Sequence, residues 1–252
     1  LRFQDLLPHA SYELATYALA ELFTRKDEAE IAELRKAGRA IDAVHAQVPQ
    51  LLQAGRTEAE VAHELEKLIL REHSVIDFVI VGSGPNGANP HHSFSDRELA
   101  EGEPVVVDIG GTLPSGYHSD CTRTYVVGGD ISKAPRDFQD AYAVLADAQA
   151  AARAAAHPGS TAADIDAITR EAISAAGWGD YFVHRTGHGI GLSTHEEPFI
   201  MEGNDLALEE GMAFSIEPGI YLEGKWGMRL EDIVVLTNDS YESLNQAPRD
   251  VR

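Results

Sequence analysis

The stretch Val105–Tyr125, VVVDIGGTLPSGYHSDCTRTY, decides how the rest of this chain is interpreted. A β-branched apolar run ends at Asp108, a turn rich in Gly, Pro and Ser follows, and Asp120 opens a second run typical of a strand. The pattern predicts a β-hairpin with one carboxylate on each arm. A carboxylate in a buried strand is costly unless it is paired, hydrogen-bonded or bound to a cation. The rest of the sequence should therefore supply partners for these two acids.

A second predicted hairpin repeats this arrangement near the C-terminus. Residues 211–221 form an apolar strand that contains Glu217, and residues 226–236 form a return strand that contains Glu231. Similar pairs of predicted helices precede the two hairpins, over residues 26–55 and 57–73 and over residues 136–157 and 162–176. Two similar halves that face each other would bring four carboxylates to one centre.

A weak internal repeat supports the two halves. Residues 55–61 resemble residues 159–165 in chemical type, and at the same offset His91 corresponds to His195. Two unrelated amphipathic helices can also show such a similarity by chance. The predicted class is α+β, with two pseudo-symmetric halves of antiparallel sheet and long helices on their outer faces.

Composition limits the possible partners. The formal net charge of −21 opposes binding to nucleic acid or to an anionic membrane, because a phosphate-binding surface needs the opposite sign. No apolar run approaches the roughly 20 residues of a membrane span. Cys121 is the only cysteine, so no internal disulfide can form and a cytoplasmic location is expected.

Four carboxylates in one pocket need compensating positive charge, because each raises the pKa of the others. Two divalent metal ions would supply it, and oxygen ligands with one imidazole suit Mn²⁺, Co²⁺, Fe²⁺ or Zn²⁺. The imidazole is offered by His188, which lies between glycines in the segment His184–Pro198. His195 follows in the same segment, where the chain can return it to the pocket.

Asp108, Asp120, His188, Glu217 and Glu231, in this order, resemble the five metal ligands of the pita-bread metallopeptidases. This superfamily includes methionine aminopeptidase, aminopeptidase P and prolidase. The sequence is most similar to the Xaa-Pro peptidase branch in four local motifs: PHH at 90–92, SDCTRT at 119–124, EPGIY at 217–221 and RLED at 229–232. The match runs from about residue 26 to residue 236. It implies a pita-bread (creatinase/aminopeptidase-like) fold.

The resemblance also implies a role for each residue. Asp108 would bind one metal ion, His188 and Glu217 the other, and Asp120 and Glu231 would bridge the two ions. The metal expected at both positions is Mn²⁺. A hydroxide between the metals would attack the peptide carbonyl. The residues expected to contact or orient the substrate are His195 and His91 as catalytic groups and His184, Tyr221 and Arg229 as substrate-binding groups. The expected substrates are small peptides with proline at the second position.

Several alternatives stay open at this stage. The enzyme could be an Xaa-Pro dipeptidase, which we favour, or an aminopeptidase P type Xaa-Pro aminopeptidase. A non-metal hydrolase of the creatinase kind has no use for four metal-facing acids, and a catalytically inactive peptide-binding homologue has no need of an intact ligand set. Residues 1–25 are expected to be a lead-in helix or a linker from a missing N-terminal region, and residues 26–252 the catalytic domain. Assembly as a homodimer is also left open.

Overall fold

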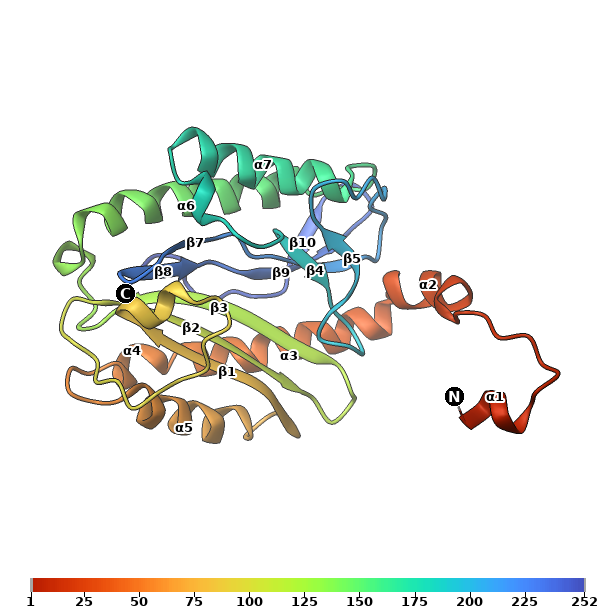
Figure 1. Ribbon diagram of the computed structural model, residues 1–252, viewed down its shortest axis with the longest axis horizontal. Helices are drawn as coiled ribbons and strands as arrows, with labels where there is room; N and C mark the ends of the chain where they lie inside the picture. Colours follow the sequence, from red (N-terminus) through yellow and green to blue (C-terminus); the bar gives the residue numbers. More distant parts are fainter. Residues whose placement is uncertain (1, 252) are drawn as a thin grey trace.

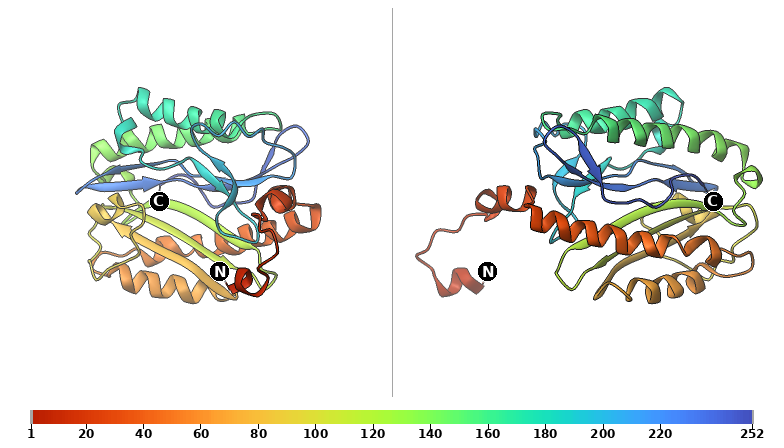
Figure 2. Two further views of the ribbon diagram at one scale, coloured as in Figure 1. Left: turned by 45° about the vertical axis from the view of Figure 1, so that its right-hand side comes forward. Right: turned by 180° about the vertical axis from the view of Figure 1, so that it is seen from behind.

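The computed structural model describes residues 2–251. Leu1, which begins the expected lead-in segment, and Arg252, which ends the expected catalytic domain, lie outside the described residues. Two helix-covered sheet units stack face to face, with the helices on the two outer sides and the strands between them (Figure 1). The second view confirms that α6 and α7 lie on the side opposite to α3 and α5 (Figure 2). This arrangement confirms the predicted α+β class with two similar halves.

The first half places three helices against a three-stranded antiparallel sheet of order β1-β2-β3. Its elements are α3 (Glu28–His45), α4 (Val48–Leu51), α5 (Glu58–Ile69), β1 (Val75–Ser83), β2 (Pro104–Thr112) and β3 (His118–Val126). Apolar side chains of α3 and α5, such as the fully buried Ile41 and Leu65, pack against side chains of the sheet such as Ile109 of β2. The predicted helix over residues 26–55 is divided because Pro49 cannot donate a backbone hydrogen bond, and a short helix, α4, begins around it.

The second half contains a five-stranded sheet of order β10-β9-β6-β4-β5 and a two-stranded sheet, β7-β8. Its elements are α6 (Arg136–Ala155), α7 (Ala162–Ala175), β4 (Gly187–Gly189), β5 (Glu196–Ile200), β6 (Ala213–Ile216), β7 (Gly219–Leu222), β8 (Trp226–Arg229), β9 (Asp232–Leu236) and β10 (Tyr241–Ser243). Buried side chains such as Phe138, Leu145 and Phe214 join α6 and α7 to these strands. Short 3₁₀ helices lie at Gly84–Ala88, Ile131–Lys133 and Gly179–Tyr181.

The internal repeat predicted from sequence is confirmed at the helix starts. Thr57 and Glu60 form a reciprocal capping box at the start of α5, and Thr161 and Asp164 form the same box at the start of α7. Each box satisfies backbone N–H groups that a helix otherwise leaves free. The two halves therefore begin their second helix by the same local chemistry.

The predicted second hairpin differs from a continuous pair of strands. Each arm is interrupted, the first at Glu217-Pro218 between β6 and β7 and the second at Leu230-Glu231 between β8 and β9. Pro218 has no backbone N–H to continue the ladder. The two acids therefore stand at a break between two sheets. There, the Glu217 and Glu231 N–H groups donate to the carbonyls of Thr186 and Thr122.

Residues 2–25 form α1 (Arg2–Leu6) and α2 (Thr16–Thr24), which extend to one side of the two stacked halves (Figure 2). The segment contains these two helices and the stretch that connects them. The division of the chain at residue 25 stays a prediction. None of the helices described between residues 2 and 251 has both the length and the apolar character needed to cross a membrane.

Candidate metal centre

The two aspartates of the first hairpin share one face of the sheet. In the β2-β3 register Asp108 pairs with Thr122 and Gly110 pairs with Asp120, so the two acids are diagonal neighbours. Gly110 has no side chain, and a Cβ there would lie 2.6 Å from the Phe78 ring. The missing side chain lets strand β1 approach closely beside the two carboxylates.

Three predicted ligands, from β3, from β4 and from the break between β8 and β9, converge in the interior. The ligand atoms of Asp120, His188 and Glu231 all lie within 4.8 Å of one another, and all three residues are buried. Glu217 adjoins this group, because its Oε1 lies 3.1 Å from His188 Nε2. Asp108 is connected to this group by Arg229, whose guanidinium forms an ion pair with the Asp108 carboxylate. All five predicted ligands therefore belong to one buried cluster.

The tautomer of His188 follows from its backbone contact. Its Nδ1 lies 3.0 Å from the carbonyl oxygen of Gly189, which can only accept, so Nδ1 is assigned the proton. In the neutral ring Nε2 then presents a lone pair to Glu217 Oε1 and, at 3.7 Å, to Asp120 Oδ2. Facing acceptors of this kind require a shared proton or a cation between them.

Burial makes it costly for the acids in this cluster to carry a negative charge. Burial raises the pKa of Asp120 well above its ordinary value, and the nearby carboxylates, Glu231 first, raise it further. Burial and the charge of Glu217 raise the pKa of Glu231 in the same way. Burial also raises the pKa of Asp108, against the opposing charge of Arg229. A divalent cation in this position would remove the repulsion that these pKa shifts express.

Two carboxylate oxygens support the fit to a metal directly. Asp108 Oδ1 and Glu231 Oε1 are buried and have no hydrogen-bond partner among the described residues. Their second oxygens are satisfied, because Arg229 binds Asp108 and Thr122 Oγ1 donates to Glu231 over 2.8 Å. A buried acceptor without a partner costs about 1–3 kcal/mol. The residues present thus fit an oxygen-binding cation, which would satisfy both free acceptors.

Side chains around the cluster fix the positions of the ligands. Thr122 Oγ1 accepts from Arg229 Nε at 3.1 Å while it donates to Glu231, and Ser215 Oγ donates to Glu217 over 2.9 Å. Sequence reasoning did not identify Thr122 or Ser215. Their signal is the strand period, because each lies two residues from a predicted ligand, Asp120 or Glu217, and so shares its face.

A cavity of about 1020 Å³ opens onto the cluster and is lined by residues from both halves. The predicted site residues on its wall are His91, Asp108, Asp120, His184, His188, His195, Glu217 and Arg229. Glu231 and Tyr221 are buried and are not among its lining residues. The structure thus brings eight of the ten predicted residues to one cavity and places the other two against residues of its wall.

Tyr221 connects two of the wall residues. Arg229 Nη1 donates to the Tyr221 hydroxyl over 2.7 Å, and that hydroxyl lies 2.9 Å from His184 Nε2. His184 Nδ1 faces the carbonyl of Arg185 at 2.7 Å, so Nδ1 carries the proton and Nε2 accepts from the tyrosine. Burial lowers the pKa of His184 to about 4, which keeps this ring neutral at physiological pH.

The two histidines predicted as catalytic groups are exposed at the cavity. The ring of His195 lies against His188, with centroids 4.0 Å apart. Partial desolvation and the neighbouring His188 lower the pKa of His195 to about 4. The next residue of the first loop, His92, is tied to the buried carboxylate of Glu58 over 2.8 Å, which holds the loop that carries His91.

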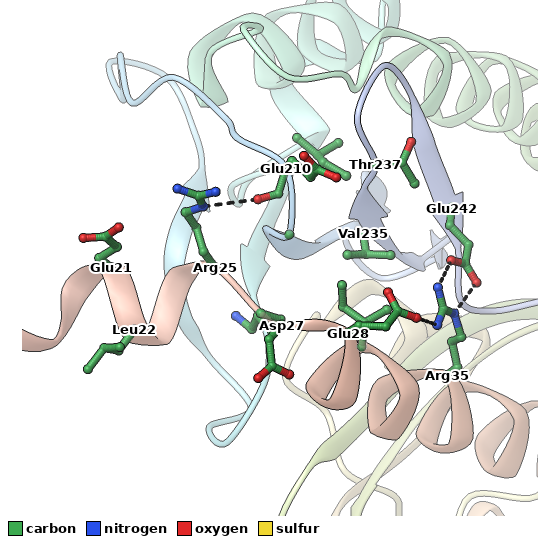
Figure 3. A pocket seen from close by; sticks show the side chains of 14 residues that line it. Glu21, Leu22, Arg25, Asp27, Glu28, Arg35, Glu210, Val235, Thr237 and Glu242 are labelled. Atoms are coloured by element: carbon green, nitrogen blue, oxygen red, sulfur yellow. Dashed lines mark hydrogen bonds and ion pairs between the residues drawn. The ribbon is translucent and has the colours of Figure 1, made fainter.

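Another cavity, of about 610 Å³, lies at the junction of α2 and α3 beside β9 (Figure 3). Its charged groups are engaged with one another: Arg35 donates to both carboxylate oxygens of Glu242 and also binds Glu28. Arg25 donates to the backbone carbonyl of Glu210. None of the predicted site residues lines this cavity, so the chemistry of the molecule is assigned to the buried carboxylate cluster.

Comparison with known proteins gives a consistent result. The model of metallopeptidase family M24 matches residues 32–238. A relative named probable dipeptidase PepE, from Mycobacterium bovis, is 57% identical over 94% of this chain and 63% of its own length. A protein named Xaa-Pro dipeptidase, from Lactobacillus delbrueckii subsp. lactis, is 40% identical over 93% of this chain and 63% of its own length.

The crystal structure of dipeptidase PepE from Mycobacterium ulcerans superposes on this chain with a TM-score of 0.93. The two are 52% identical, and the match covers 99% of this chain and 66% of the other. This similarity confirms the predicted pita-bread fold. The chain spans 63% of the length of each of the two sequence relatives named above.

Proposed function

Since this chain belongs to metallopeptidase family M24, we propose that it hydrolyses Xaa-Pro dipeptides with the help of two divalent metal ions. The observation that carries the proposal is the buried cluster of one imidazole and four carboxylates, in which two carboxylate oxygens lack any partner among residues 2–251. Such a cluster is costly in a folded protein unless a cation completes it. The names of the two sequence relatives support a dipeptidase.

The proposed ligand assignment follows the sequence prediction. Asp108 would hold one metal ion, His188 and Glu217 the other, and Asp120 and Glu231 would bridge the pair. Manganese is the proposed native metal, since the donor set is rich in oxygen. When bound, the metal ions supply Lewis-acid polarisation of the scissile carbonyl and lower the pKa of the attacking water.

The remaining site residues bind and orient the substrate in this proposal. His195 and His91 stand at the cavity, where their imidazoles can donate a hydrogen bond to the oxygen of the scissile carbonyl as its charge develops. His184, held by Tyr221, would form the pocket wall for the proline ring. Arg229 compensates part of the negative charge of Asp108 and keeps the tyrosine in place.

An aminopeptidase P type activity and a catalytically inactive peptide-binding role are the alternatives. They are separated by metal analysis combined with assays on an Xaa-Pro dipeptide and an Xaa-Pro-Xaa tripeptide. Turnover of the dipeptide that requires metal supports the proposal, and preference for the tripeptide supports an aminopeptidase. Full activity in chelator without bound metal overturns the metal-dependent mechanism, and metal binding without any turnover favours the inactive homologue.

Glu217→Ala tests the ligand assignment. The variant should lose metal-dependent turnover by several orders of magnitude and keep its circular dichroism spectrum. Glu223→Gln, an exposed change in the turn between β7 and β8, is the matched control and should keep wild-type rates. Wild-type turnover by Glu217→Ala contradicts the assignment. The cytoplasmic location and a homodimeric assembly stay predictions.

A further inference from the structure

The cavity over the carboxylate cluster contains one unusual cation. Two arginines line it, and Arg229 is engaged with Asp108 and Tyr221. The second is Arg185, which is half-buried and forms no ion pair with any residue between 2 and 251. In a chain of net charge −21, an arginine on the wall of an acidic cavity without a carboxylate partner needs an explanation.

The side chain of Arg185 is supported without being neutralised. Its guanidinium carbon lies 4.6 Å from the centroid of the Phe199 ring, so the planar group rests on the aromatic face. Stacking of this kind leaves the N–H groups at the edge of the guanidinium available to a partner. Phe199 belongs to strand β5, which is paired in the five-stranded sheet and gives a rigid base.

The backbone at Arg185 is also fixed. Its carbonyl accepts from His184 Nδ1, and the next residue, Thr186, is held through its N–H and hydroxyl by the buried carboxylate of Asp166. The charge of Arg185 reaches the catalytic region, since it is among the causes that lower the pKa of His195. A preorganised guanidinium therefore faces the cavity within electrostatic range of the proposed catalytic histidine.

We propose that Arg185 binds the terminal carboxylate of the peptide substrate by a bidentate ion pair, and so selects dipeptides over longer peptides. The inference rests on the proposed peptidase function and deepens it by naming the group that the site reads. Carboxylate is the partner whose geometry matches the two parallel N–H donors of a guanidinium. A peptide extended beyond proline carries no charge at that position and would leave the arginine unpaired.

The test compares a dipeptide with its C-terminal amide, for example Ala-Pro and Ala-prolinamide, on the metal-loaded full chain. In Arg185→Gln the ratio of kcat/KM for the acid over the amide should fall about 10- to 100-fold, the range expected for a lost charge-assisted hydrogen-bonded pair. Arg185→Lys keeps the charge without the planar fork and should recover part of the ratio. Arg136→Gln, an exposed arginine on α6, is the control and should leave the ratio unchanged.

Inhibition by free proline gives a second measurement that does not depend on turnover of the amide. Its inhibition constant should rise in Arg185→Gln by a similar factor, and that of prolinamide should not. An unchanged acid-to-amide ratio in a correctly folded Arg185→Gln overturns the role of Arg185 while the peptidase function stands. Failure of the metal-loaded wild type to hydrolyse either compound overturns the proposed function, and this inference with it.

Discussion

Replacing Asp120 by Asn should stabilise the metal-free protein. Asp120 and Glu231 are buried with ligand atoms no more than 4.8 Å apart, and the cluster holds further acids beside them. An asparagine keeps the shape of the side chain and removes one negative charge. The usual expectation for a change in the interior is a loss of stability, so a gain would be diagnostic of charge repulsion at this site.

The expected size follows from the geometry. Two unit charges 4.8 Å apart repel by about 3.5 kcal/mol at an effective dielectric constant of about 20. From this we subtract about 1 kcal/mol for an amide whose hydrogen bonds are incompletely satisfied. The free energy of unfolding in chelator should therefore rise by about 1–3 kcal/mol. Saturating metal reverses the order, because a ligand at about 100-fold its Kd stabilises the wild type by about 2.7 kcal/mol, and the variant has lost a ligand.

Urea unfolding at neutral pH, in chelator and in excess Mn²⁺, measures both effects. Asp232→Asn is the matched control, since Asp232 is equally buried but is paired with Arg123 at 2.7 Å and Arg249 at 2.6 Å. Its neutralisation leaves the buried guanidinium of Arg123 without a charged partner and should cost about 3–5 kcal/mol with or without metal. A loss of stability for Asp120→Asn in chelator, or equal metal stabilisation of variant and wild type, refutes the reasoning.

Three further changes test how the fold supports the site. Lys26→Met removes the partner of Glu196, which lies 2.6 Å away in a buried pair, and should cost about 3–5 kcal/mol in urea unfolding; a second change, Glu196→Gln, should recover part of it. Gly38→Ala should cost about 1–3 kcal/mol although alanine favours helices, because its Cβ would lie 2.3 Å from the carbonyl oxygen of Leu244; a gain in Tm would contradict this. Burial lowers the pKa of His45 to about 3 in the folded chain. Below about pH 6.5 the His45 ring therefore binds a proton in the unfolded chain but stays neutral in the folded chain. The stability difference between wild type and His45→Gln should therefore narrow by about 2 kcal/mol from pH 7 to pH 5, and a constant difference would exclude this role.

The sequence predicts the parts of this molecule whose causes are local. The capping boxes at Thr57 and Thr161 are visible in four residues each, and the first hairpin is visible from its apolar runs and its turn. The buried Arg123 forms an ion pair over 2.7 Å. Its partner Asp232 lies on another strand, so only the fold identifies which acid it is.

The breaks in the second hairpin could not be predicted from local pattern. Residues 211–221 are mostly apolar, and this pattern predicts one strand that runs through Pro218. The strand stops there because the Glu217 N–H leaves the ladder to bond the Thr186 carbonyl, which comes from a distant segment. The same holds for Arg185: its type and position are plain in the sequence, but only the folded chain shows that no carboxylate among the described residues pairs with it.

The two halves position their histidine loops by the same physical means but with different residues. In the first half the buried Glu58 accepts hydrogen bonds from His92 and Ser95 in the loop that carries His91, and from the Ser83 N–H at the end of β1 over 2.7 Å. In the second, the buried Asp166 accepts from the N–H of Thr186 at 3.1 Å, in the segment that carries His188. Both acids lie on the helix of their half that begins with the capping box, α5 or α7. The sequence repeat nevertheless aligns Glu58 with Ala162, so the equivalence exists in the fold and not in the alignment. A carboxylate buried under each loop costs free energy unless its oxygens accept hydrogen bonds. Backbone and side-chain donors around each loop supply these hydrogen bonds. Each of the two histidine loops is thus held by a buried acid of an adjacent helix, and neither acid is among the proposed metal ligands.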